Sequence, residues 1–379
     1  MKLAIISTEK LPVPAVRGGA IQIYIDAVSR TIAQQHQVTV ISITDSSLED
    51  NEQRNGVRYI RYDEDQYIQK IVQHMENEKY DVVHLCNRPA WIQKLKDASP
   101  NTKFVLSVHN EMFDYNKISD NDGEQCIAST SKIVTVSDYI GQTITTRFPI
   151  AKSKTKTVYS GVDLNEYQPV WTAEGKRARA AMREKLGLTN KKVILFVGRL
   201  SKVKGPHILL QALPKIIREH PDVMMVFVGS KWFGEDEINN YVKHLYTLGA
   251  LYHNNVTFFK FIRPIDIPSL YSMADLFVCS SQWQEPLARV HYEAMGAGLP
   301  IITSNRGGNP EVVEEGKNGH IIFDFENPDA YAQIINSLLS NPSKRETMGK
   351  YGRKKVENEF GWNRVASSLL QVYEEALRQ

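Results

Sequence analysis

Residues 193–219 read VILFVGRLSKVKGPHILLQALPKIIRE, and they carry the clearest indication of the fold class. Its opening run, Val193–Gly198, is apolar and rich in β-branched residues, without polar alternation. That pattern is typical of a strand buried on both faces of a parallel sheet. A loop with a glycine at each end, Gly198 and Gly205, follows the strand, and a helical pattern then covers Pro206–Glu219. The stretch therefore predicts one strand–loop–helix unit of an α/β fold.

The same alternation continues along the chain and occurs twice, with a break between. Strands are expected at Leu3–Ser7, Val38–Ile43, Asp81–Leu85, Phe104–His109 and Ile133–Ser137, and then at Val193–Gly198, Met224–Gly229, Val256–Phe261, Leu276–Ser280, Pro300–Ser304 and His320–Phe323. Helices are expected at Ala20–Gln34, Pro206–Glu219, Glu237–Leu248 and Asp329–Ser340. Strand–helix–strand alternation implies right-handed βαβ units, and so two doubly wound, Rossmann-like lobes facing across a cleft.

The break lies at about Asp163–Asn190 and holds the basic, Ala-rich segment KRARAAMREKLGL. We place one domain at 1–168 and the second at 169–360. The charges of the basic segment are expected to form a solvated helix face, with binding to a membrane surface as the alternative. The last residues, 360–379, carry an apolar stripe at helical spacing, which requires a partner surface.

Composition limits the class of protein. The chain has 379 residues, and its 46 Lys and Arg against 43 Asp and Glu give a net charge of +3. That balance argues against a dedicated nucleic-acid binder. Three cysteines without a C-x-x-C pair favour reduced thiols and a cytoplasmic protein. The N-terminal apolar run is interpreted as a first strand and not a signal peptide, and no stretch approaches the roughly 18 apolar residues of a membrane span.

The loop between Gly198 and Gly205 is a candidate anion site. Two glycines before a helix bring backbone N–H groups close to a ligand, and Arg199 and Lys204 add two cations. Arg grips phosphate oxygens in a fork and Lys adds a point charge, which together suit a diphosphate. The alternative is a loop with two solvated cations. A Walker-type phosphate loop is excluded, because its G-x-x-x-x-G-K-[ST] pattern is absent.

A second candidate lies in residues 280–300, SSQWQEPLARVHYEAMGAGLP. Pro286 suits the first position of a helix, which would put Glu285 at the helix N-terminus. Glu293 would follow on the same face, about 10–12 Å away at roughly 1.5 Å rise per residue. Two such carboxylates could hold separate hydroxyl-bearing parts of one extended ligand. The alternative is that Glu285 only caps the helix and Glu293 is only a surface charge.

The first half offers weaker candidates. Gly18 and Gly19 precede the helix at Ala20 and would expose backbone amides there, although a simple tight turn is the favoured explanation of the pair. His109 closes a strand and either is structural or contacts a sugar hydroxyl, and neither role needs it charged. Metal ligation by the acidic loops 63–65 and 120–122 is not expected, since both lie away from the strand ends.

Several motifs together resemble a known family. GRLSKVKG (198–205) and QEPLARVHYEAMGAGLPIITSNRGGNPE (284–311) resemble the second-lobe signature of retaining GT-B glycosyltransferases, more narrowly family 4, the group 1 type. The spacing from Glu285 to Glu293 matches the paired-glutamate motif of that family. The resemblance covers nearly the whole chain, and in texture the sequence is similar to spore-coat-associated glycosyltransferases of endospore-forming bacteria.

The resemblance implies a role for each matching residue. Arg199 and Lys204 would bind the nucleotide diphosphate, and Glu293 would bind the ribose. Glu285 and His109 would contact the donor sugar, one from each lobe. The remaining implied contacts are backbone amides near Pro286, Leu287 and Ala288 for the sugar, Gly18 and Gly19 for the distal phosphate and acceptor, and Phe261 and Arg263 near the nucleobase. The terminal helix, 361–379, would cross back onto the first lobe.

The implied activity is transfer of a hexose from a nucleotide diphosphate sugar to an acceptor, with retention at the anomeric carbon and without metal. UDP is the expected nucleotide, with GDP and ADP as alternatives, and no further cofactor is expected. The acceptor could be a saccharide, a lipid or a protein, and peripheral membrane association or deposition in the spore coat is implied. One departure is Ala288, which stands where many members have Gly. The competing hypothesis is a GT-B coat or scaffold protein that has lost turnover.

Overall fold

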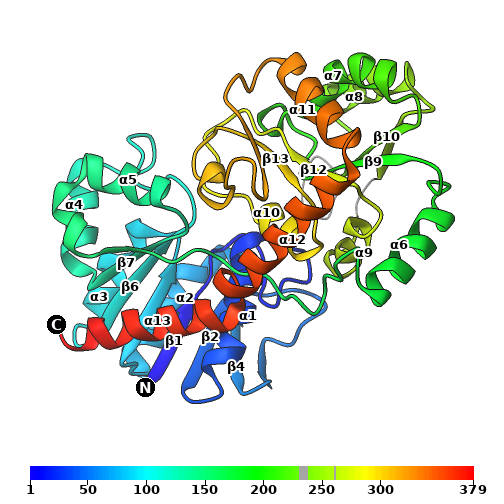
Figure 1. Cartoon of the computed structure of the whole chain (residues 1–379). Coiled ribbons are helices and arrows are strands. Elements are labelled where there is room, and N and C mark those ends of the chain that lie inside the picture. Colours follow the sequence, from blue (N-terminus) through cyan, green and yellow to red (C-terminus); the bar gives the residue numbers. More distant parts are fainter. Residues whose placement is uncertain (230–237, 260–261) are drawn as a thin grey trace. The chain divides into compact units, whose positions relative to one another are not determined.

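The computed structural model describes residues 1–229, 238–259 and 262–379, and these divide into two compact units (Figure 1). The first unit is Met1–Gly161 with Trp362–Gln379, and the second is Val162–Gly361. The division falls earlier than the boundary expected after residue 168. The reason is local packing, because the ring of Tyr167 meets Tyr271 edge-on at 5.7 Å and its carbonyl accepts a hydrogen bond from Arg353 at 2.7 Å.

The first unit is built on an eight-stranded sheet in the order β3-β4-β2-β1-β5-β6-β7-β8. Neighbouring strands are parallel except for the antiparallel pair β3–β4. The strands are β1 (Lys2–Ile6), β2 (Gln37–Ile43), β3 (Asn51–Arg54), β4 (Val57–Tyr62), β5 (Val82–Cys86), β6 (Lys103–Val108), β7 (Lys132–Thr135) and β8 (Thr155–Thr157). The sheet is thus wider than the sequence predicts, by β3, β4 and β8.

Helices cover both faces of this sheet, as the alternation of side chains along β1 requires. Leu3 and Ile5 pack in one core cluster with residues of α1 (Ala20–Ile32) and α13 (Trp362–Leu377). Ala4 and Ile6 pack in the opposite cluster, with α2 (Tyr67–Asn77), α3 (Ile92–Ala98), α4 (Asp120–Ser129) and α5 (Asp138–Arg147). The C-terminal helix therefore completes the core of the unit in which the chain begins.

The second unit has a fully parallel six-stranded sheet in the order β11-β10-β9-β12-β13-β14. Its strands are β9 (Lys192–Val197), β10 (Val223–Val228), β11 (Val256–Phe259), β12 (Leu276–Cys279), β13 (Ile301–Ser304) and β14 (Gly319–Ile322). The helices are α6 (Ala173–Lys185), α7 (Pro206–Glu219), α8 (Asn240–Ala250), α9 (Ile267–Tyr271), α10 (Val290–Gly296), α11 (Pro328–Leu339) and α12 (Pro342–Glu359). Residues 237 and 260–261, at the ends of two expected elements, lie outside the described residues.

The basic segment predicted to be a solvated helix face forms α6, and that expectation is wrong for two of its arginines. Arg179 and Arg183 bind the two oxygens of Asp275 at 2.6 and 2.7 Å. Arg183 also donates to the carbonyl of Met273 at 2.9 Å. These charges fix the helix to its own unit, whereas Arg177 is exposed as expected. None of the helices among the described residues has both the length and the apolar character needed to cross a membrane.

Candidate functional site

The loop after β9 is pressed against the end of the neighbouring strand β12. Gly205 has φ of 70°, and a Cβ atom there would lie 2.0 Å from the carbonyl oxygen of Ser280. Only glycine permits both this backbone conformation and this approach. The turn places Lys204, at the end of a short 3-10 segment (Lys202–Lys204), beside the loop that follows β12. Arg199, at the start of the same loop, is half-buried.

Lys204 and Glu285 form a buried ion pair at these strand ends, with side-chain exposures of 17% and 8%. Lys204 Nζ, Ser281 Oγ and Trp283 Nε1 all donate to Glu285 Oε2, the last two at 2.9 and 2.8 Å. Among the described residues no side chain donates to Oε1, so this oxygen can accept from a ligand. Burial raises the pKa of Glu285, but the Lys204 charge and the three hydrogen bonds outweigh it and leave the pKa below its usual value.

Glu285 is not at a helix N-terminus, contrary to the sequence prediction. Helix α10 begins at Val290, and Pro286–Arg289 are irregular. The cause is a tertiary contact: the amide of Ala288 donates to Asn309 Oδ1 at 3.1 Å, so the chain does not turn into a helix there. The helix-dipole argument for Glu285 therefore fails, and its charge is stabilised by Lys204.

The sequence reasoning assigned no role to the residues that hold the Glu285 backbone. Gly307 has φ of 57°, and a Cβ atom there would lie 2.0 Å from the carbonyl oxygen of Glu285. That carbonyl accepts from the amide of Gly308 at 2.8 Å, and Gln284 Oε1 accepts from the amide of Gly307 at 2.6 Å. The one sequence feature that pointed to these residues was the Gly-Gly-Asn run after β13. It is part of the family resemblance, but no function was assigned to it.

The amides expected to face the sugar near Pro286–Ala288 reduce to one. Proline has no N–H, and the amide of Ala288 is committed to Asn309. Within the part of the chain that the structure describes, the amide of Leu287 has no hydrogen-bond partner, so of the three it is the one that can donate to a ligand.

The other expected residues of the second unit lie in different surroundings. Glu293 is on α10, where its Oε2 accepts from Tyr271 Oη at 2.8 Å and its Oε1 lies 3.8 Å from Arg289. Arg263 is exposed and pairs with Asp266 at 2.7 Å. Phe261, expected near the nucleobase, lies outside the described residues.

His109 belongs to the first unit and is held at the end of β6 by polar and aromatic contacts. Its amide donates to Asn87 Oδ1 at 3.0 Å, and its Nε2 lies 3.1 Å from Ser107 Oγ. The ring of Tyr24 meets it edge-on with 5.0 Å between centroids. Burial lowers the pKa of His109 to about 4, so the ring is neutral at pH 7.

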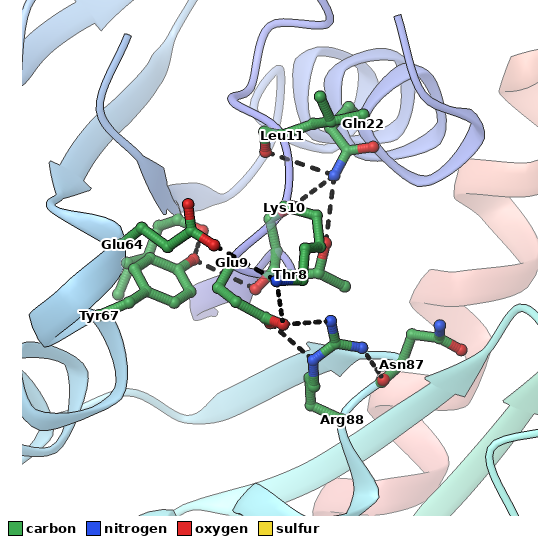
Figure 2. A network of polar contacts seen from close by, with 11 residues as sticks. Thr8, Glu9, Lys10, Leu11, Gln22, Glu64, Tyr67, Asn87 and Arg88 are labelled. Carbon is green, nitrogen blue, oxygen red and sulfur yellow. Dashed lines mark hydrogen bonds and ion pairs between the residues drawn. The ribbon is translucent and has the colours of Figure 1, made fainter. Parts of the chain in front are cut away.

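Asn87 is itself fixed by a network at the ends of β1 and β5 (Figure 2). Its backbone is left-handed, with φ of 59°, and its carbonyl accepts from Arg88 at 2.8 Å. Arg88 binds both carboxylate oxygens of Glu9, at 2.6 and 2.7 Å. Figure 2 also shows Gln22 of α1 donating to the loop that follows β1, at Thr8 and at the carbonyl of Leu11. Sequence reasoning missed Asn87 and Arg88 because nothing near them in the chain marks them.

The paired glycines before α1 have left-handed backbone conformations that favour glycine. Gly18 and Gly19 have φ of 83° and 101°. A Cβ atom on Gly19 would lie 2.3 Å from Gln22 Oε1 and 2.7 Å from Leu11. Both residues therefore shape the turn into α1 that the resemblance assigns to ligand binding.

The acidic segments 63–65 and 120–122, which were not expected to bind metal, have other partners, and the second is the first turn of α4 and not a loop. Asp120 pairs with Arg147, and Asp122 accepts from Ser119 Oγ at 2.7 Å. Glu64 pairs with Lys10 at 3.3 Å. Within the described ranges no group of three or more His, Cys, Asp or Glu side chains is arranged to hold a metal ion.

The buried histidines of the first unit predict a pH dependence of stability. Burial lowers the pKa of His84 to about 3 and that of His109 to about 4, against 6.5 in the unfolded chain. Between these values only the unfolded state binds the protons, so stability falls as pH falls from 6.5 toward 4, by at most about 1.4 kcal/mol per pH unit for each histidine. Urea midpoints at pH 7.0, 6.0 and 5.0 should decrease in that order. A flat or rising midpoint would contradict the assignment, and His84→Gln should weaken the dependence.

The comparisons identify the class of protein. Residues 178–355 match the family described as "Glycosyl transferases group 1", and residues 18–166 match "Glycosyltransferase Family 4". The chain belongs to this glycosyltransferase family, and its two parallel-sheet α/β units have the GT-B fold.

The chain is also similar to particular proteins. The chain is 67% identical over 374 residues to "Spore coat protein SA" of Bacillus subtilis (strain 168), with 99% of each chain covered. It is similar in structure to Anabaena Alr3699/HepE, solved in complex with UDP and glucose, at a TM-score of 0.78 and 24% identity over 98% of each chain. It is also similar to a glycosyltransferase from Rickettsia africae ESF-5, at a TM-score of 0.81 and 20% identity, with 100% of this chain and 99% of that one covered.

Proposed function

We propose that this chain transfers a hexose from a nucleotide diphosphate sugar, with UDP as the nucleotide, to an acceptor hydroxyl, with retention at the anomeric carbon and without a metal ion. The observation that carries the proposal is the Lys204–Glu285 pair. It unites a cation and an anionic hydroxyl acceptor in one buried site at the carboxyl ends of adjacent strands, where ligands bind in open α/β sheets.

The two side chains divide the donor between them. Lys204 has three N–H donors, of which Glu285 takes one, so two remain for diphosphate oxygens. Glu285 keeps Oε1 for a sugar hydroxyl, and its lowered pKa keeps it ionised at neutral pH. Arg199 adds a second cation from the same loop. The donor is thereby held on both sides of the bond that breaks.

Charge development explains why these groups accelerate transfer. The leaving diphosphate gains negative charge in the transition state, and Lys204 and Arg199 stabilise it most at that point. The bond from the anomeric carbon to the phosphate oxygen breaks as the acceptor oxygen approaches the same face. The departing phosphate oxygen takes the acceptor proton, so no separate base is needed. Neutral His109 contacts the sugar as a hydrogen-bonding partner without adding charge.

The proposed location follows by analogy from a relative. The name of the B. subtilis relative supports deposition of this protein in a spore coat after synthesis in the cytoplasm.

Glu293 binds the ribose, Arg263 lies near the nucleobase, and Gly18 and Gly19 approach the distal phosphate in this proposal. The competing hypothesis, a scaffold without turnover, is opposed by the intact Lys204–Glu285 pair, since an unused buried charge pair is costly to keep.

Thermal melting against a nucleotide panel tests the proposal. The full chain is melted with UDP, GDP, ADP and their common sugar conjugates, each with and without EDTA, beside an Arg199→Ala/Lys204→Ala variant. We expect a higher Tm with UDP and a UDP-sugar, because a ligand that binds only the folded state stabilises it by mass action, and no shift in the variant. No shift with any nucleotide in the wild-type chain would overturn the proposal in favour of the scaffold. A shift that EDTA removes would overturn metal independence alone.

A further inference from the structure

A cavity of about 390 Å³ lies in the first unit, apart from the contacts of His109 described above. It is lined by α5 and by the segment after β6, including Glu111, Asp114, Tyr115, Gln142 and Thr146. Its volume is within the usual range for small-molecule sites. The segment that forms one wall begins just after His109, so the cavity and the proposed sugar contact share one stretch of chain.

The helical wall is polar where it faces the cavity. Tyr139, Gln142, Thr143 and Thr146 recur at helical spacing and form one stripe of α5, while Ile140 and Ile144 on the opposite stripe are buried in the core. Among the described residues, the side chains of Gln142 and Thr146 have no hydrogen-bond partner. The stripe therefore presents an amide and a hydroxyl to whatever enters the cavity.

An aromatic ring completes the opposite wall. Tyr115 is 75% exposed although it is large and partly apolar. The guanidinium of Arg147 lies 4.0 Å from its ring centroid and covers one face. Arg147 is in turn fixed by Asp120 and by the carbonyls of Phe113 and Ile118. Arg147 therefore holds one face of a ring that remains largely exposed.

The charges of the lining select the ligand. Four of the five N–H groups of Arg147 donate to other residues of the protein, so the cavity offers almost no cationic donor to a ligand. Glu111 accepts from Tyr139, and Asp114 Oδ1 accepts from Asn116 at 2.9 and 3.0 Å. No other described residue donates to the second oxygen of either carboxylate, so each can accept from a ligand. Carboxylate oxygens beside an exposed aromatic ring suit a ligand that has many hydroxyl groups around an apolar face. The same carboxylates repel anionic ligands.

We infer that this cavity is a saccharide subsite that binds a neutral or amino sugar of the acceptor, away from its reacting end. The inference rests on the proposed function, which it deepens by naming a glycan as the acceptor class. The sugar ring would stack on the open face of Tyr115, and its hydroxyls would donate to Glu111 and Asp114 and bond with Gln142. A phosphorylated acceptor would find almost no cationic donor there.

A printed array of neutral, amino and acidic glycans, probed with the fluorescently labelled full chain, tests the inference. We expect binding to neutral or amino glycans, at least tenfold weaker in Tyr115→Ala and in Gln142→Ala, and largely retained in Tyr115→Phe because the ring remains. Tyr351→Ala, which alters a tyrosine that is 38% exposed in the second unit, is the matched control and should bind as wild type. No glycan binding, binding only to acidic glycans, or undiminished binding by Tyr115→Ala would overturn the inference.

The nucleotide melting experiment on the same preparations separates the two proposals. A nucleotide shift with a blank array removes the saccharide subsite and leaves the proposed function standing. Glycan binding that depends on Tyr115, without any nucleotide shift, removes the proposed function and shows that the cavity binds saccharides. Retention of the nucleotide shift in Tyr115→Ala is expected and shows that the donor site of this variant is intact.

Discussion

Replacing Lys204 by alanine should lower kcat/KM for donor turnover about 100- to 1,000-fold, the range measured when one preorganised charge-stabilising donor is removed from an active site. The reason is that Lys204 would contact the diphosphate as its negative charge increases, in a site where its own exposure is only 17%. Steady-state hydrolysis of the UDP-sugar that shifts the melting curve measures the effect without a known acceptor. Lys202→Ala, in the same short 3-10 segment but exposed, should retain wild-type turnover.

The same substitution affects folding, and a second variant separates the two effects. Lys204→Ala leaves the buried Glu285 carboxylate without its counter-ion, which should lower the free energy of unfolding by about 3 kcal/mol. Adding Glu285→Gln removes that uncompensated charge and should restore part of the stability. It should not restore turnover, because the cation for the leaving group is still absent. Recovery of activity together with stability in the double variant would show that Lys204 acts only through folding.

How much of the fold the sequence predicts depends on the position of each strand. Central strands such as β1 and β9 are buried on both faces, and their apolar runs predict them to within about a residue. The edge strand β3 reads NEQR and is exposed, so it carries no apolar pattern. It forms because it pairs with β4, which is a tertiary cause. The short edge strand β8 escapes prediction for the same reason.

The candidate site shows the same limit. Spacing after β9 and β12 picks out Lys204 and Glu285, because the carboxyl ends of adjacent parallel strands lie together. The prediction that a helix begins at Pro286 is wrong. Local preference favours that start, but Ala288 donates to Asn309, which lies far away in the chain, and this contact prevents it. The close approach of Gly307 to Glu285 and the hydrogen bond from His109 to Asn87 cannot be predicted for the same reason, because each contact joins residues far apart in the chain.

The structure also predicts a large loss of stability on replacing Asp275 by alanine, by about 3–5 kcal/mol in the second unit. Asp275 accepts from Arg179 and Arg183 at 2.6 and 2.7 Å, and from the amide of Val193 at 2.7 Å. The two arginines are only 22% and 12% exposed. Without the carboxylate, two positive charges lie close together in a poorly hydrated place, and the amide at the start of β9 loses its partner.

Chemical denaturation of the full chain measures this effect, followed by tryptophan fluorescence and fitted as two transitions because the chain has two units. Asp222→Ala is the matched control. Its carboxylate is 45% exposed and lies 3.4 Å from Lys192, which is 33% exposed, so the change should be under about 1 kcal/mol. Adding Arg179→Met and Arg183→Met to Asp275→Ala removes the repelling charges and should recover part of the loss. Equal, small losses for Asp275→Ala and Asp222→Ala would show that the basic face of α6 is solvated after all, as the sequence alone suggests.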